Sequence, residues 1–261
     1  MRETRSRPKN LHAGWRWLGL AAVIAVYWAA MRGSEFRPAA LRDAVPAIGA
    51  LLWNMLPPDF GYLPRLLEPA VQTLQVGILS TLVSSALALP VAYLAARNFS
   101  PSRSVFYGMR FVLTVFRGIS ELIWALIFVV AVGLGPFAGV LAIIVFGVGA
   151  QGKLLAEAIE NADQGPVEAL IVAGVPRWKA FIYAAFPGVW VEYVAQSLHF
   201  WDHNTRAAAI LGFVGAGGLG YTLLHAIGAY QYPRAAMAII VLVAMITLID
   251  RLSLWLRRRI A

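Results

Sequence analysis

The chain has 261 residues, of which 60% are hydrophobic and 13% are charged, and its mean hydropathy is +0.69. This composition excludes a water-soluble domain and predicts an all-helical protein that crosses a bilayer several times. The formal net charge of +9 does not indicate nucleic-acid binding, because the basic residues stand at the ends of apolar runs. The absence of cysteine excludes disulfides and thiolate metal sites.

Apolar runs long enough to span a bilayer recur along the chain and predict six transmembrane helices. They cover about residues 15–31, 69–96, 110–133, 137–158, 188–212 and 234–256. The first run is followed by Arg32, Glu35 and Arg37 instead of a cleavage pattern, so we expect a retained helix. We divide the chain into residues 1–68, with the tail, first span and outer segment, and residues 69–261, with the membrane core.

Lys and Arg near the span ends predict the orientation in the membrane. If six spans alternate, one side receives most of these residues: Arg2, Arg5, Arg7, Lys9, Arg16, Arg97, Arg103, Arg110, Lys153, Arg177, Lys179, Arg257, Arg258 and Arg259. The other side receives Arg32, Arg37, Arg42 and Arg65. We therefore expect both termini in the cytoplasm.

The stretch between the fourth and fifth predicted spans contains clear signals for helix starts and stops. Gly165 suits an N-cap, Pro166 suits the first helical position, and Glu168 lies in the first turn, where a carboxylate is favoured. Gly174 suits a left-handed C-terminal residue, and Pro176 stops the helix. We expect a short helix, a sharp turn and a second helix.

The second helix of this elbow is predicted to have one apolar face, formed by residues at helical spacing: Trp178, Phe181, Ile182 and Ala185. A rigid helical elbow on the cytoplasmic side has the shape needed to dock into a groove of a soluble partner. Its alternative is an amphipathic connector that only covers the membrane surface.

Several residues of the elbow resemble the EAA loop of ABC importer permeases: Glu168, Ala169 and Leu170, then Gly174, then Phe186 and Pro187. This resemblance implies that Glu168, Ala169, Gly174 and Pro187 couple the chain to an ATPase subunit. The chain departs from the usual pattern at Ala184, where Ile is common, and at Phe186, where Leu is common. Both changes are apolar and leave docking plausible.

Other stretches resemble the phosphonate-importer permease family, which includes carriers of phosphite and hypophosphite: residues 121–128, 133–142, 153–160, 204–206 and 211–220. The resemblance implies a type I ABC importer permease in the bacterial inner membrane. It also implies a pore made by two copies of the chain, two cytoplasmic ATPases that hold ATP and Mg²⁺, and a periplasmic binding protein. No catalytic residue, cofactor or metal is expected in this chain.

Charged and amide side chains inside predicted spans are candidates for a substrate pathway, because burying them is costly unless they face protein or water. Arg117 and Glu121 are four residues apart, which allows either a structural ion pair or a place on the pathway. Asn204 and Arg206 have the donors needed to bind an anion's oxygens. Asp202 is close enough in sequence to neutralise Arg206 instead.

His199 and His203 share a helix face and could suggest zinc, but the zinc-protease pattern needs Glu after the first His, where Phe200 stands. We expect packing roles for both histidines. The final glycine run is predicted to form a helix break or gate: Gly215, Gly217, Gly218 and Gly220.

The chain lacks a Gly-x4-Gly-Lys-Ser/Thr phosphate loop, so we expect ATP to be handled by another polypeptide. Two rival functions remain open. One is a methionine-type permease, whose outer glycine run looks similar, and the other is an intramembrane enzyme.

Overall fold

The computed structural model describes residues 12–34 and 40–260, which form helices and connections without a β-strand. Parts of the predicted orientation and of the retained first helix rest on residues outside these ranges: Arg2, Arg5, Arg7, Lys9, Glu35 and Arg37. The chain forms two compact units, one up to Trp53 and one from Asn54 onward. The boundary predicted after residue 68, between the outer segment and the membrane core, stays a prediction.

The first unit contains α1 (His12–Gly33) and α2 (Ala40–Asn54). The apolar part of α1, Trp17–Gly33, is at the short end of what a span requires. The described side chains of both helices are almost all exposed.

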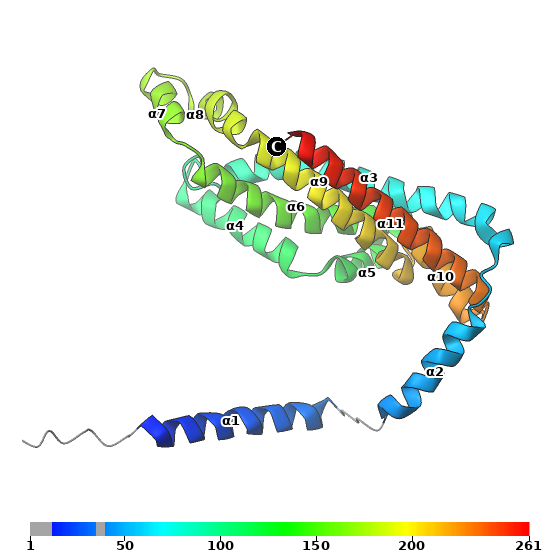
Figure 1. Ribbon diagram of the computed structural model, residues 1–261. Coiled ribbons are helices and arrows are strands. Elements are labelled where there is room, and N and C mark those ends of the chain that lie inside the picture. The colour runs from blue at the N-terminus through cyan, green and yellow to red at the C-terminus, as the bar shows by residue number, and fades with distance from the viewer. Residues whose placement is uncertain (1–11, 35–39, 261) are drawn as a thin grey trace, which may run out of the picture. The chain divides into compact units, whose positions relative to one another are not determined.

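The second unit is a bundle of long helices joined by short ones. Its elements are η1 (Phe60–Tyr62), α3 (Leu63–Ala95), α4 (Arg103–Gly118), α5 (Glu121–Val132), α6 (Pro136–Asn161), α7 (Gly165–Val172), α8 (Arg177–Ala180), the π-helical turn η2 (Phe181–Ala185), α9 (Phe186–Leu211), η3 (Gly212–Val214), α10 (Gly218–Gly228) and α11 (Tyr232–Ile260). Helix α3 packs along α6 and α9, and α11 packs along α9 (Figure 1). We call the end with α7 and α8 the elbow end, and the end where α9 meets α10 the glycine end.

Four helical stretches are long and apolar enough to cross a membrane: Phe60–Ala95, Pro136–Asn161, Arg177–Gly228 and Tyr232–Arg259. A fifth crossing is possible through α4 and α5, which are bent by 90° relative to each other. The prediction of one helix over residues 110–133 is therefore wrong. Gly118 ends α4, and Ser120 takes the capping position of α5 ahead of Glu121.

The bent pair α4–α5 crosses the bundle as a broken span. Near the elbow end, Arg110 contacts the C-terminal turn of α6 through Glu160. In the middle, Gly149 of α6 lies against the backbone of α4, since a Cβ there would meet the backbone nitrogen of Arg117 at 2.6 Å. At the glycine end, the backbone N–H of Gly135 donates to Gly215. The pair thus follows α6 from end to end, and the predicted order of spans in this unit is kept.

Candidate functional site

The elbow consists of α7, a turn at Gly174, and α8. Gly174 has φ +85°, which confirms the predicted left-handed residue. Its N–H donates to the carbonyl of Ile171, and the N–H of Val175 donates to Leu170, a pair of bonds that closes the helix end. At the start of α7, Gly165 already has helical geometry, and its N–H donates to the carboxylate of Asp163 at 2.9 Å.

The second helix of the elbow differs from its prediction. Helix α8 runs through the π-helical turn η2 directly into α9, so the elbow and the fifth span are mechanically continuous. The predicted apolar face is divided, because Ala185 and most of Phe181 are buried while Trp178 and Ile182 are 54% and 46% exposed. The two buried residues are four positions apart, and so are the two exposed ones, so two neighbouring rows of the same face have different surroundings.

Part of the set with EAA-like identity lies on the outside of this unit, while Leu170 and Phe186 are half-buried against the core. Glu168, Ala169 and Pro187 are exposed, whereas Val167 is 4% exposed and packs inward. The exposed set is therefore free to contact another protein.

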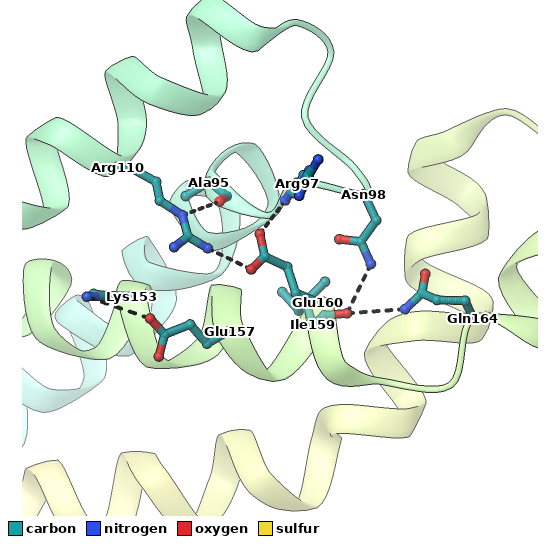
Figure 2. A network of polar contacts seen from close by, with 9 residues as sticks. All are labelled: Ala95, Arg97, Asn98, Arg110, Lys153, Glu157, Ile159, Glu160 and Gln164. Carbon is teal, nitrogen blue, oxygen red and sulfur yellow. Dashed lines mark hydrogen bonds and ion pairs between the residues drawn. The ribbon is translucent and has the colours of Figure 1, made fainter.

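The carboxylate of Glu160 joins the elbow end to the bundle (Figure 2). The sequence alone did not indicate a role for this residue. It accepts a hydrogen bond from the Arg110 guanidinium at 2.8 Å and another from the backbone N–H of Arg97 at 2.6 Å. The side-chain amides of Asn98 and Gln164 both donate to the neighbouring carbonyl of Ile159. The end of α6, the α3–α4 connection and the start of α7 are thus held together.

Aromatic packing reinforces this connection. The ring of Phe181 lies 5.0 Å from that of Tyr93 and 5.3 Å from that of Phe99, both in edge-on geometry. Phe99 is 1% exposed. The turn after α8 therefore packs on α3 and on the connection that follows it.

In the spans, Arg206 pairs with Asp202 one turn earlier on α9. The side chain of Asp202 is 4% exposed, while that of Arg206 is 44% exposed. Asp202 thus binds one guanidinium nitrogen of Arg206, as the spacing allowed, while the rest of the guanidinium group remains accessible.

Asn204 points elsewhere. It is fully buried between α9 and α3, where its amide donates to the hydroxyl of Thr81 at 2.9 Å. The structure therefore does not bring Asn204 and Arg206 together, although they are two residues apart.

Arg117 and Glu121 do not form the ion pair that their spacing allows. The bend between α4 and α5 removes the helical spacing that would pair them, and Glu121 instead lies 3.6 Å from the imidazole of His203. His203 stacks on Phe146 of α6. Arg117 is exposed, and no ion pair of its side chain is found in residues 12–34 and 40–260.

The glycine run forms the turn between α9 and α10. Gly215, Gly217 and Gly218 have φ of +92°, +73° and +71°, so the chain leaves the helix in conformations that other residues rarely adopt. The first N–H groups of α10 are satisfied by α3: Gln72 accepts from Gly218 at 2.7 Å, and Thr73 accepts from Leu219 at 3.0 Å. The predicted helix break is present here.

Gly220 marks the closest approach in this turn. A Cβ at this position would overlap the carbonyl oxygen of Ala209, and it would also lie 3.2 Å from the Cα of Gly212. Backbone therefore packs directly on backbone where α10 crosses the end of α9.

Residues 88–261 match the model of a protein family described as the binding-protein-dependent transport system inner membrane component. Over 94% of its length, the chain is 37% identical to the phosphite transport system permease protein PtxC of Stutzerimonas stutzeri, of which it covers 90%. It is 39% identical to the phosphate-import permease protein PhnE of Mycolicibacterium smegmatis, covering 82% of this chain and 40% of that protein.

Among solved structures, the chain is similar to one of the MetNI methionine ABC transporter in an inward-facing conformation. The TM-score is 0.67 and the identity is 19%, with 78% of this chain and 99% of the other covered. At 19% identity this similarity establishes the fold, that of the ABC importer permeases. It gives no information about the compound that this chain transports.

Proposed function

The chain belongs to the family of binding-protein-dependent transport system inner membrane components, and from this premise we propose that it moves a phosphorus oxyanion into the cell. It is a permease subunit of an ABC importer, located in the inner membrane, and not an enzyme. The proposed cargo is phosphite, hypophosphite or a phosphonate.

The observation that carries this proposal is the similarity to a phosphite permease along nearly the whole chain, at 37% identity over 246 residues. The methionine-type rival has only a similarity of fold, at 19% identity. The chemistry of α9 agrees with an anionic cargo, because the exposed part of Arg206 has planar donors that suit two oxygens of one anion.

A permease of this family works with an ATPase and a substrate-binding protein. The proposed assembly contains two copies of this chain and two ATPases, which hold the ATP and Mg²⁺. Pairing agrees with the length of the Mycolicibacterium relative: 82% of this chain corresponds to only 40% of that protein, which is therefore long enough to hold two such chains.

In the proposed mechanism, closure of the ATPases pushes the exposed α7 and Gly174 turn of each copy, and the bundle reorients between two conformations. The continuous path from α8 through η2 into α9 supports direct transmission to the span. The Glu160 network supports transmission to α3 and α4.

The proposed orientation places both chain termini and the elbow in the cytoplasm, because positive charges gather on that side. Cysteines introduced at Ser34 and Gln164 are then expected to label from opposite sides. Labelling of position 164 by an impermeant reagent in intact spheroplasts contradicts this orientation.

The cargo is tested by reconstituting the chain with its ATPase and binding protein in liposomes and measuring uptake of phosphite, hypophosphite, methylphosphonate, phosphate and methionine. We expect ATP-dependent uptake of at least one of the first three and none of methionine. Uptake of methionine alone, or ATP-independent chemistry on any of these compounds, overturns the proposal.

A further inference from the structure

The connection between α3 and α4 has a basic groove that plays no part in the elbow or in the proposed transport. The groove has a volume of about 490 Å³ and is lined by residues of this connection and of the start of α4: Arg97, Ser100, Ser102, Arg103, Phe106 and Tyr107. We call it the α4 groove. It is lined by two arginines and by no carboxylate.

The two arginines of the α4 groove are not neutralised by the described part of the chain. Arg97 and Arg103 are exposed, and neither forms an ion pair within residues 12–34 and 40–260. The carboxylate of Glu160 contacts this connection, but one of its oxygens accepts from the backbone N–H of Arg97 and the other from Arg110. The groove therefore contains two guanidinium groups whose donors are free to bind an anion.

Other groups at the same place also favour an anion. The hydroxyl of Ser102 accepts a hydrogen bond from the N–H of Val105 at 3.2 Å, and among the described residues it donates to none, so its proton can bind a further acceptor. Arg103 begins α4, a helix of 16 residues, so the positive end of the helix dipole lies at the groove.

One wall of the α4 groove is held in place by the bundle. The guanidinium of Arg110 lies over the ring of Phe106, 5.0 Å from its centre, and the ring of Tyr107 is 5.1 Å from that of Phe106 in edge-on geometry. Arg110 is itself fixed by Glu160 at 2.8 Å and by the carbonyl of Ala95 at 3.2 Å (Figure 2). Because this wall is already ordered, a ligand loses little free energy in ordering it.

The α4 groove lies where the chain leaves one span and enters the next. The apolar stretch of α3 ends at Ala95, two residues before Arg97, and Arg103 begins the broken span of α4 and α5. Basic side chains at the ends of spans lie at the level of the lipid headgroups. The groove is therefore within reach of the phosphate groups of the bilayer.

The exposed face of α4 continues from the groove with aromatic rings. Tyr107 and Phe111 follow Arg103 in steps of four residues, which places the three on one side of the helix. The two aromatic residues are 67% and 69% exposed. A cationic group at the surface followed by apolar rings deeper along the helix matches a lipid, which has a phosphate followed by acyl chains.

We infer that the α4 groove binds the headgroup of an anionic phospholipid, with Arg97 and Arg103 on the phosphate oxygens and an acyl chain along Tyr107 and Phe111. The planar fork of arginine holds two oxygens of one phosphate. A free phosphate ion offers the same oxygens but leaves the exposed rings unexplained. The proposed orientation places this site in the cytoplasmic leaflet, and the site does not depend on which cargo is transported.

The bound lipid is expected to stabilise the elbow end, because Arg97 takes part in two contacts. Its side chain lines the α4 groove, while its backbone N–H donates to Glu160 at 2.6 Å. A phosphate held by both arginines ties the α3–α4 connection to the start of α4. It thereby adds a further link to the network that Glu160 forms with Arg110.

The site is tested in the purified complete complex with its ATPase. Arg97→Gln/Arg103→Gln removes both guanidinium groups and keeps the backbone N–H that Glu160 binds, so the elbow end stays assembled. Arg251→Gln/Arg258→Gln is the matched control, because it removes the same charge at two exposed positions of α11 that do not line the groove. Binding of phosphatidylglycerol is titrated by native mass spectrometry, and thermal unfolding is followed in nanodiscs of phosphatidylcholine with and without phosphatidylglycerol.

We expect phosphatidylglycerol to bind the unmodified complex and to raise its unfolding midpoint by about 3 °C. In the groove variant we expect the affinity for this lipid to fall roughly tenfold and the rise to disappear, while the control variant keeps both. The groove variant is expected to match the unmodified complex in phosphatidylcholine alone. Equal losses in the groove and control variants, or equal binding of phosphatidylglycerol and phosphatidylcholine, overturn the site.

Two further measurements separate a lipid from a free anion. Tyr107→Ser/Phe111→Ser is expected to weaken binding of phosphatidylglycerol, because both rings are exposed and contact the acyl chain in the proposed site. Inorganic phosphate, compared with chloride at the same ionic strength in phosphatidylcholine nanodiscs, is expected to leave the unfolding midpoint unchanged. A rise with inorganic phosphate that is lost in the groove variant, or unchanged lipid binding in the ring variant, overturns the lipid as the ligand.

Discussion

The two ends of the bundle are held by opposite means. At the elbow end, large and charged side chains reach across gaps between segments, as the carboxylate of Glu160 does toward Arg110 at 2.8 Å. At the glycine end, segments meet through backbone, as in the bond from the Gly135 N–H to the carbonyl of Gly215 at 2.9 Å. The elbow end therefore depends on long side chains that bridge segments, and the glycine end depends on close backbone contacts together with the side chains of Gln72 and Thr73.

This difference fits the movements proposed for an importer. Long side chains that bridge segments can shift by rotamer changes while staying bonded, which suits an end that is pushed by a partner. Backbone packed on backbone has no such freedom, so we expect the glycine end to move as one piece. Removing atoms is expected to break the first end, and adding atoms is expected to break the second. The predictions below run from the largest expected effect on stability to the smallest.

Gly220→Ala is expected to have the largest effect, because its added Cβ collides with the carbonyl oxygen of Ala209 and the backbone must shift. We expect the midpoint of thermal unfolding of the purified complex to fall by about 5 °C or more. Gly228→Ala is the control within the same helix, since nothing lies within 4 Å of its added Cβ. Equal midpoints for the two variants contradict backbone packing at the glycine end.

Glu160→Leu is expected to be the next most damaging change, since it removes the acceptor of Nη2 of Arg110 and of the N–H of Arg97, and leaves the Arg110 guanidinium only the carbonyl of Ala95. The expected loss of stability is about 2 kcal/mol, with a matching loss of uptake. The double variant Arg110→Leu/Glu160→Leu is expected to recover part of the stability, because no charge is left stranded. A double variant less stable than either single variant contradicts this account.

The contrast between the two ends also separates what the sequence predicts from what it does not. The turn at Gly174 is predictable because its signals, a glycine followed two residues later by Pro176, are adjacent in the chain. The bond between Glu160 and Arg110 joins residues fifty positions apart, and only the packing of α4 on α6 brings them together.

Two errors have a local physical cause. The helix over residues 110–133 is interrupted although most of its residues are apolar, and the neglected signal was Gly118 followed by Ser120 and Glu121. The same interruption separates Arg117 from Glu121, whose partner His203 comes from α9. Helical spacing predicts neighbours only where the helix is continuous.

Gly174→Val tests the elbow with a smaller effect on stability. A β-branched residue at φ +85° costs about 1–2 kcal/mol, and the exposed turn can relax without disturbing the bundle. We expect normal membrane insertion and a collapse of coupled uptake. Gly174→Asn is the matched variant, because Asn tolerates this conformation, and it is expected to retain most of the uptake. Wild-type coupling in the Val variant contradicts a role of the turn in docking.

Arg206→Lys is expected to have the smallest effect on stability and still to impair transport. Lys keeps a positive charge beside Asp202, whose side chain is only 4% exposed, so the buried carboxylate is not left alone. The ammonium lacks the planar fork that can hold Asp202 and an oxyanion at once, so we expect uptake at low substrate concentration to fall roughly tenfold, equivalent to one charge-assisted hydrogen bond of about 1.5 kcal/mol. Arg206→Ala is expected to lose both stability and uptake, and Asp202→Asn/Arg206→Ala to regain assembly without regaining uptake. That separation identifies Arg206 as part of the anion's route, whereas a double variant that transports at the wild-type rate makes the pair purely structural.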